Sequence, residues 1–470
     1  MWCFFLSREV SHACGLGAWH NRGMKQTVTL IVIVIFGSCL GNLSQTALNS
    51  MFSGMVVDFG IEASLGQWVT TLYMLVLGIT VPAVTYLMRR FELKNLVLGA
   101  LCLLLLGSAI DALAPNFPVL IVGRVLQAIS AGIAMPMMIT IVMTRFPPNR
   151  QATVMGIAGI AMGFAPNIGP TIGGWMVEWT SWRSFFIAMC VGAAILIVAA
   201  ALLVKKSGQG NTDAKLDAPS LLFSAVGFGG LLTGFTNASN YELQSPLVWA
   251  PVLVGALFLA LYLRRQRKTP NPLTNLAIFD SWRFRASFWA GNTLFACYMG
   301  ITLILPLFIE GLWGGTTLQA GMALLPGTVA AFFVNPIAGY LVDRIGARPV
   351  IVTAACSLAI GSVSMAFIDV STPFWLIIVM QSFRAIGVSG LIGPLTSWGM
   401  ADLPKEIMGD GSSFSTALRQ ACAAMGTALM MFLVTMGADA GAPLVGYQAA
   451  FALSGMFGVA TLAIAVLRAR

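Results

Sequence analysis

The sequence predicts an all-α, polytopic membrane protein with about fourteen transmembrane helices, and three observations support this fold class. Of the 470 residues, 58% are hydrophobic and only 9% are charged, a composition foreign to soluble globular domains. The chain contains about fourteen apolar runs of roughly 20 residues, the length that crosses a hydrocarbon core of about 30 Å. Lys and Arg concentrate in alternate gaps between these runs. A membrane bundle of helices is the architecture that these features share.

The apolar runs define the predicted helices in chain order. They cover residues 27–57, 64–88, 95–114, 117–144, 150–176, 184–204, 218–238, 246–263, 286–309, 317–341, 349–368, 374–400, 408–436 and 447–467. We number each gap by the run that it follows. Of the 26 Lys and Arg, 22 lie at the two ends of the chain or in the even-numbered gaps, whereas the odd-numbered gaps hold only Arg183. Because Lys and Arg are retained on the cytoplasmic side during insertion, we expect a multi-pass protein of the cell (inner) membrane with both termini cytoplasmic.

Several function classes are excluded by what the sequence lacks. The net charge of +9 follows from the loop asymmetry, and no basic aromatic patch suggests nucleic-acid binding. No Gly-Lys pair occurs, so the chain has no Walker-A loop and no ATP-driven pump of its own. Both histidines, His12 and His20, precede the first run, and the eight cysteines show no metal-site spacing. We expect no metal, no cofactor and no enzymatic activity, with any transport driven by a gradient or a partner.

An internal repeat divides the chain. The frame x-Tyr-Leu-x-x-Arg occurs at Tyr86 and again at Tyr340, in the gaps after the second and the tenth runs. Two runs further along each copy, a single Arg lies within an apolar segment, at Arg124 and Arg384. Repeated halves with a substrate site at their interface are typical of secondary transporters.

The repeat predicts four parts of the chain. They are a cytoplasmic N-terminal extension at 1–26, a six-helix half at 27–204, a linker with two inserted helices at 205–285, and a second six-helix half at 286–470. Met24 is an alternative start to Met1.

The loop after the tenth run carries a family signature, G-x-L-x-D-R-x-G-R-[KR]. Its matches are Gly339, Leu341, Asp343, Arg344, Gly346 and Arg348. With these residues the chain resembles the major facilitator superfamily, in its 14-helix drug:proton antiporter branch. Asp343 can cap a helix start and pair with a neighbouring Arg, which would form a latch that breaks when the halves rock; the alternative is a solvated turn. In the first copy Arg89 replaces the family Asp, so that copy lacks the carboxylate of a latch.

Two further helices resemble the family. Arg124 and Gln127 match the pattern R-x-x-Q-G, and the resemblance implies a role for Arg124 in proton coupling. The alternative is an Arg that only holds backbone carbonyls. The fifth run resembles the antiporter motif through Gly163, Pro166, Gly169, Pro170, Gly173 and Gly174. Glycines four apart allow helices to approach and prolines bend the helix, so a purely packing role is the alternative reading.

The first run departs from the branch. Ser44 stands where the family carries an acidic residue, which removes the usual proton-binding or cation-binding carboxylate. Asn42, Gln45 and Asn49 remain on one helix face, suited either to a polar neutral substrate or to interhelical hydrogen bonds.

Three carboxylates near helix ends, Asp58, Asp111 and Glu310, are the candidates to carry a proton in place of the missing acid. Glu310 is the preferred one, and ordinary exposure is the alternative for each. The buried arginines outnumber the embedded acids, which hints at an anionic substrate group. The cavity candidates beyond the first run are Trp68, Tyr73, Gln127, Asn335, Arg384 and Arg419.

Together these features predict a secondary active transporter that exports amphipathic small molecules or drugs by alternating access and is coupled to proton influx. The expected partners are a small-molecule substrate, protons and the lipid bilayer, with no nucleic acid; the oligomeric state is left open. Two alternatives stay open: a facilitator or proton symporter of a polar or anionic metabolite, and a transport-inactive membrane sensor or assembly protein.

Overall fold

The computed structural model describes residues 22–61, 66, 68–205, 217–238, 245–269 and 272–468, a part of the chain that is largely helical and contains no strand. Its long helices are α2 (Arg22–Phe59), α4 (Trp68–Arg90), α5 (Leu93–Ala112), α6 (Phe117–Arg145), α7 (Pro148–Gly159), α8 (Ala165–Trp179), α9 (Trp182–Leu203), α10 (Ala218–Asn237), α11 (Pro246–Gln266), α12 (Trp282–Gly311), α13 (Thr317–Ile345), α14 (Ala347–Met365), α15 (Phe374–Met400), α16 (Met408–Asp439) and α17 (Pro443–Arg468). The short segments η1 (Ile160–Phe164), η2 (Leu276–Asp280) and η3 (Lys405–Ile407) connect or interrupt them.

Fourteen of these helical segments are long and apolar enough to cross a membrane, with α7, η1 and α8 forming one span. The predicted fold class is therefore confirmed. The first helix begins at Arg22 rather than at residue 27, and residues 1–21 of the expected extension lie outside the described part.

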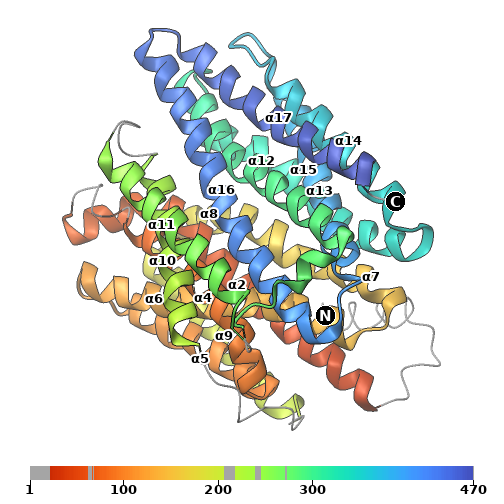
Figure 1. The fold of residues 1–470 in the computed structure, drawn as a ribbon. Helices are drawn as coiled ribbons and strands as arrows, with labels where there is room; N and C mark the ends of the chain where they lie inside the picture. Colours follow the sequence, from red (N-terminus) through yellow and green to blue (C-terminus); the bar gives the residue numbers. More distant parts are fainter. Residues whose placement is uncertain are drawn as a thin grey trace.

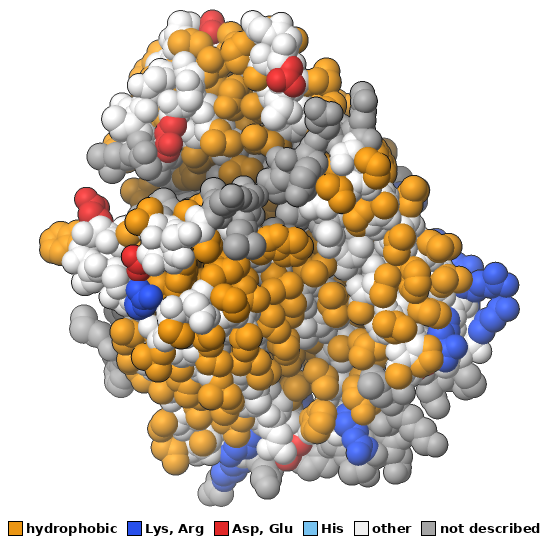
Figure 2. Space-filling model, turned by 90° about the vertical axis from the view of Figure 1, so that its left-hand side faces the viewer, with side chains coloured by type: hydrophobic (Ala, Val, Ile, Leu, Met, Phe, Trp, Pro, Cys, Tyr) orange, Lys and Arg blue, Asp and Glu red, His pale blue; other side chains and the backbone are white. Residues whose placement is uncertain are grey.

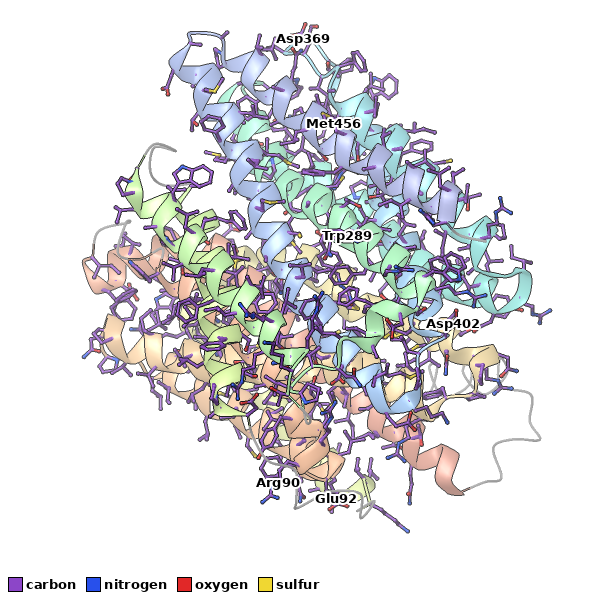
Figure 3. All side chains as sticks on the ribbon, viewed as in Figure 1. Arg90, Glu92, Trp289, Asp369, Asp402 and Met456 are labelled. Atoms are coloured by element: carbon purple, nitrogen blue, oxygen red, sulfur yellow. The ribbon has the colours of Figure 1, made fainter. Side chains whose placement is uncertain are left out.

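The two ends of the molecule differ in charge. Figure 3 shows Arg90 and Glu92 at the bottom of the bundle and Asp369 at the top. We call the end with Arg90 the basic end and the end with Asp369 the far end. In Figure 2 the Lys and Arg side chains gather mainly along the lower and right-hand edges, and most Asp and Glu lie at the upper left. The surface between them is predominantly hydrophobic, as expected of a bundle surrounded by lipid.

The helices form two groups (Figure 1). In the N-terminal group, α2 packs against α6, α8 and α9, and α5 packs against α6 and α9. In the C-terminal group, α12 packs against α15, α16 and α17, while α14 packs against α15 and α17. The outer helices leave an apolar stripe uncovered; on α9 it includes Ile187, Val191 and Ile195, spaced four residues apart. Such a stripe faces lipid in a membrane.

The inserted helices α10 and α11 bridge the two groups. They approach each other closely where Gly230 meets Gly255. On its other side α10 contacts both α4 and α16. Leu232 reaches Gly78 of α4, and the ring of Phe228 lies 6.2 Å from that of Phe414 in α16. The pair therefore touches the N-terminal and the C-terminal group at once.

Contacts between the two groups concentrate toward the basic end. There α7 lies along α13 and α15, and α16 lies along α4 and α6. Beyond η1, α8 turns to α2 of its own group, and few of its residues reach α13. Figure 1 shows the two groups leaning apart toward the top, and Figure 2 shows a recess beneath the upper lobe. The described helices are thus closed at the basic end and separated at the far end.

Candidate functional site

A buried polar cluster lies inside the N-terminal group around Arg124. The Arg124 side chain is fully buried and donates hydrogen bonds through Nη1 to Ser44 Oγ at 2.7 Å and to Gln127 Oε1 at 2.6 Å. Its guanidinium carbon lies 4.3 Å from the ring centroid of Tyr73, whose hydroxyl donates to the Gly41 carbonyl at 2.9 Å. These bonds join α2, α4 and α6, and the arginine is held by side chains rather than by backbone carbonyls.

Asp111 of α5 is the carboxylate of this cluster. Its side chain is fully buried against Gly123 of α6, although it is the penultimate residue of its helix, at the far end. It interacts electrostatically with Arg124, yet among the described residues neither carboxylate oxygen has a hydrogen-bond partner. The same holds for Arg124 Nε and Nη2. A buried acid and a buried base therefore lie in one cluster without a direct hydrogen bond between them.

The other two acid candidates are placed differently. Glu310, the preferred one from the sequence, is exposed at the end of α12. Asp58 is also exposed and accepts hydrogen bonds from Trp182 Nε1 and Arg183 Nη1, each at 2.8 Å. Those two bonds hold the pKa of Asp58 below its usual range. Of the three candidates, Asp111 is buried, whereas Asp58 and Glu310, the one preferred from the sequence, are exposed.

The polar face of α2 is partly engaged in helix packing. Asn42 Nδ2 donates to the Ser38 carbonyl at 3.0 Å and to the Ala161 carbonyl of η1 at 2.9 Å. Gln45 is buried, at 8% exposure. The side chain of Asn49 lies outside the described residues. Trp68, the outermost cavity candidate, is 48% exposed at the start of α4.

The Gly- and Pro-rich span contains a π-helical segment, η1, which ends two residues before Pro166. Pro166 has no N–H to donate to the preceding turn, so the local ladder is interrupted. Side chains also donate to carbonyls of this segment: Asn167 donates to the Gly163 carbonyl at 2.8 Å, and Tyr298 of the C-terminal group donates to it at 3.4 Å. The π-segment therefore lies where the two groups meet.

The glycines of this span allow close contact with α2. A side chain at Gly169 would collide with Thr46, and one at Gly173 would lie 2.6 Å from the Ala47 carbonyl. Gly174 has more space, since its nearest neighbour would be 3.6 Å away. Pro170 lies inside α8. The motif thus holds α8 against its own group, away from the C-terminal group.

One closure at the basic end is centred on Asp343, near the end of α13. Its carboxylate accepts hydrogen bonds from the backbone N–H of Ala152 at 3.3 Å and of Thr153 at 2.7 Å, and from the Thr153 hydroxyl at 2.5 Å. Gly339 permits this approach, because a Cβ there would collide with the Ala152 carbonyl. One turn before Gly339 along α13, Asn335 is fully buried against Gly159. Asp343 thus holds α13 to the start of α7.

The basic residues of the same loop point elsewhere. Arg344 and Arg348 are exposed, and Arg344 lies over the Tyr340 ring at 5.2 Å. Neither takes part in the ion pairs of the described residues. Gly346 has a φ of 90°, a conformation that glycine adopts without strain, and it ends α13. The expected pairing of Asp343 with a neighbouring arginine is replaced by bonds to helix N–H groups.

A second closure lies at the equivalent place in the first repeat. Arg89 donates to both carboxylate oxygens of Asp410, at 2.8 and 2.7 Å, and Asp410 is fully buried near the start of α16. Asp410 also accepts from the Asn275 N–H at 3.1 Å, and Arg89 donates to the Pro272 carbonyl at 3.2 Å. The first copy therefore does form a polar closure despite losing the family Asp. Sequence reasoning missed Asp410, because no motif contains it.

Two arginines lie within the C-terminal group without an acid. Arg384 is 1% exposed and donates from Nε to Gln381 at 2.8 Å, while its Nη1 forms no hydrogen bond with a described residue. Arg419 is 8% exposed and donates from Nε to the Ser415 carbonyl at 3.2 Å. Among the described residues, neither forms an ion pair. The two groups of helices therefore differ, since only the N-terminal one sets a buried carboxylate beside its arginine.

Comparison with known proteins agrees with this architecture. The family model described as Major Facilitator Superfamily matches residues 34–427. An uncharacterized MFS-type transporter of Bacillus subtilis (strain 168), YcnB, is 33% identical over 434 residues, 92% of each chain. The lincomycin resistance protein LmrB of the same organism is 30% identical over 418 residues, 88% of this chain and 86% of LmrB.

A solved structure shows the same fold at low identity. The proton:xylose symporter XylE, bound to 6-bromo-6-deoxy-D-glucose, superposes with a TM-score of 0.64 at 15% identity, over 94% of this chain and 95% of XylE. With a family match over most of its length and relatives that align along nearly all of it, the protein belongs to the Major Facilitator Superfamily.

Proposed function

We propose that this protein is a secondary active transporter that exports amphipathic small molecules and draws its energy from proton influx. The observation that carries the proposal is the buried Asp111, which interacts electrostatically with Arg124 and has no hydrogen bond from either oxygen to a described residue. The similarity to LmrB, a lincomycin resistance protein, supports drugs as substrates. The membrane is the cell membrane, and the basic end faces the cytoplasm, in accordance with the retention of Lys and Arg on that side.

In this orientation the structure corresponds to a state open to the outside. The closures at Asp343 and at Asp410 keep the cytoplasmic side shut. Asp111 lies next to the outer end of α5, so a proton reaches it from the outer side over a short path. Protonation neutralises the carboxylate and changes its attraction for Arg124, which is otherwise fixed by Ser44 and Gln127. That change biases the rocking of the two six-helix halves, 27–204 and 286–470, about the interface at η1.

The missing acid of α2 fits this assignment. Ser44 stands at the family's acidic position and hydrogen-bonds to Arg124 and Gln127. The carboxylate has moved from α2 to α5, yet it still faces the same arginine. We therefore assign proton binding to Asp111 and its positioning to the cluster of Ser44, Tyr73, Arg124 and Gln127.

The test is substrate-induced proton movement in proteoliposomes that contain a pH-sensitive dye. Tetraphenylphosphonium and lincomycin serve as probes, and Asp111→Asn is compared with the parent. We expect the parent to move protons on substrate addition and Asp111→Asn to lose this response while still binding the probe. Asp58→Asn is the matched control, because Asp58 is an exposed carboxylate outside the cluster. An unchanged proton response in Asp111→Asn would overturn the assignment.

A second candidate function is favoured by Arg384 and Arg419. Two buried arginines without acids suit a facilitator or symporter of an anionic metabolite. In the same assay, flux of an organic anion without proton movement, and with no response to the cationic probe, would support this candidate.

A further inference from the structure

The inserted pair carries an open groove at the basic end of the molecule, where α10 begins and α11 ends. The groove is lined by Phe223, Leu261, Arg264, Arg265, Lys268 and Thr269. Four of the five residues from 264 to 268 are cations. The groove therefore combines an apolar part with a strongly basic one.

The protein itself neutralises only one of these cations. Arg265 pairs with Asp217, since its Nε and Nη2 lie 3.0 and 2.8 Å from the two carboxylate oxygens. Arg264, Arg267 and Lys268 are exposed, and none of them takes part in an ion pair of the described residues. Three positive charges close together on one stretch of chain repel one another and attract an anion.

An uncovered apolar stripe leads along α11 to the groove. Leu253, Leu257 and Leu261 lie four residues apart and are 66%, 57% and 36% exposed. Arg264 and Lys268 continue the same face of the helix and of the turn that follows it. The main neighbour of α11 is α10, which leaves this face of α11 uncovered.

The length of the stripe matches the depth of one leaflet. From Leu253 to Leu261 a helix rises about 12 Å, and half of a hydrocarbon core is about 15 Å thick. When an acyl chain lies along these leucines, the phosphate of the same lipid lies at the level of Arg264 and Lys268. A lipid therefore satisfies both parts of the groove at once, whereas a small anion reaches only the basic part.

The inward side of the same turn holds the linker after α11. Gln266 Oε1 accepts a hydrogen bond from the Thr274 N–H at 3.1 Å, and the Tyr262 hydroxyl lies 2.6 Å from Thr274 Oγ1. The next residue, Asn275, donates its N–H to Asp410 at the closure. A ligand that fixes the outward side of this turn therefore also restrains the segment that contacts the closure.

We propose that this groove binds the phosphate of an anionic membrane lipid. Arg264 and Lys268 contact the phosphate, the first as a planar fork of donors and the second as a point charge, while an acyl chain packs along Leu257 and Leu261. The bound lipid holds the end of α11 and the linker in place and so favours the state in which the basic end is closed. Retention of positive charge during insertion, the ordinary role of such cations, requires no groove and no preference among lipids.

The first experiment measures lipid binding to the purified full-length protein by native mass spectrometry. Dioleoyl phosphatidylglycerol and dioleoyl phosphatidylcholine share their chains and differ in charge, and inorganic phosphate is added as a competitor without chains. We expect the phosphatidylglycerol to bind roughly tenfold more tightly than the phosphatidylcholine, and this preference to disappear in the double variant Arg264→Gln with Lys268→Gln. Inorganic phosphate at equal concentration should not displace the lipid. The matched control, Lys205→Gln with Arg468→Gln, removes two exposed cations after other helices and should keep the preference.

The second experiment tests the effect on the linker. Hydrogen exchange at the amides of Thr274 and Asn275 is measured in nanodiscs of either lipid. We expect slower exchange in phosphatidylglycerol for the parent and equal exchange in the two lipids for the double variant, because the lipid then no longer holds the end of α11. Equal exchange in the parent would overturn the effect on the closure.

A single charge reversal, Lys268→Glu, keeps the binding test decisive if the double variant fails to fold. It places an acid in the groove and should also remove the preference for phosphatidylglycerol. The lipid site is overturned if the parent binds both lipids equally, if these variants keep the preference, or if inorganic phosphate displaces the lipid. That last result would assign the groove to a soluble anion instead.

Discussion

The two closures at the basic end occupy equivalent places in the repeat but use opposite charges. In the second repeat an acid, Asp343, ends its helix and binds the N–H groups of α7. In the first repeat a base, Arg89, ends the equivalent helix and binds an acid, Asp410, on α16. In both closures the acid belongs to the C-terminal group, but it lies near the end of α13 in one and near the start of α16 in the other. The difference teaches that the same contact can be made by an acid with helix N–H groups or by an acid with an arginine.

The closures also differ in how closely the helices approach. At Gly339 the backbone of α13 touches that of α7, whereas at Gly409 the nearest atom to a Cβ would be the flexible Met88 Cε, at 3.2 Å. One closure is a backbone contact and the other is a side-chain contact. Substitutions should therefore affect the two unequally.

The largest effect is expected from Gly339→Ala. Its new methyl group would collide with the Ala152 carbonyl, which cannot move away as a side chain can. Overpacking of this kind costs about 1–3 kcal/mol, and here it destabilises the state in which the basic end is closed. Transport in proteoliposomes should fall roughly tenfold or more. Gly409→Ala should cost little, and Gly321→Ala, on the same helix in open space, should match the parent. Equal losses for Gly339→Ala and Gly409→Ala would erase the distinction between the closures.

Arg89→Ala is expected to rank second. It leaves the carboxylate of Asp410 buried without its main partner, and loss of a hydrogen bond to a charged group costs about 1.5–3 kcal/mol. Because Arg89 is 41% exposed in its side chain, we place the effect at the lower end of that range. The exchange Arg89→Asp with Asp410→Arg should restore part of the flux, whereas Arg90→Ala should not impair it. A double exchange that is worse than either single variant would contradict the complementarity argument.

Asp343→Asn should have a smaller effect on rate. The amide still accepts a hydrogen bond from α7 but loses the negative charge that strengthens it, a difference of about 1 kcal/mol. We expect slower flux with unchanged substrate affinity, measured as turnover in proteoliposomes beside binding in detergent. Asp369→Asn, in an exposed loop at the far end, is the control. Loss of substrate affinity in Asp343→Asn would place Asp343 in the binding site instead.

The smallest effect is expected at the far end, where Asp58 and Arg183 form an exposed ion pair at 2.8 Å. The bonds from Trp182 and Arg183 lower the pKa of Asp58, so the pair contributes fully above the ordinary carboxyl pKa of about 3.9 and is lost only as pH falls through the lowered value. Thermal stability of Asp58→Asn should match the parent closely from pH 5 to 8, and added salt should narrow any gap. A large, pH-dependent loss within that window would show that this pair holds α2 to α9 more firmly than an exposed ion pair is expected to.

The fold was accessible from sequence because apolar run length and the alternation of Lys and Arg report depth in the membrane. They do not report how a helix is rotated or what it faces. Asp111 illustrates this: its position beside the last residue of a helix predicts exposure, but the backbone of α6 passes so closely at Gly123 that the carboxylate is fully buried. Glu310 is likewise the penultimate residue of its helix, α12, and its side chain is exposed.

Asp410 shows what the repeat could have revealed. Arg89 is the counterpart of Asp343, and Asp343 should meet the start of a helix of the other half. An acid at the start of the run 408–436 is then the natural partner of Arg89, and Asp410 is that acid. By contrast, the bonds of Asn275 and Pro272 to this closure follow from the path of the linker, which no motif or periodicity encodes.

Those linker bonds give the inserted helices a consequence of their own. Because the segment after α11 hydrogen-bonds to both Arg89 and Asp410, and α10 lies on both α4 and α16, the closure is a three-body contact. In the alternating-access cycle that we propose, opening the basic end requires the linker to release one partner or follow it. The linker after α11 then limits how far the two halves move apart, and a change in its length should change the amplitude of that movement without a substitution at Arg89 or Asp410.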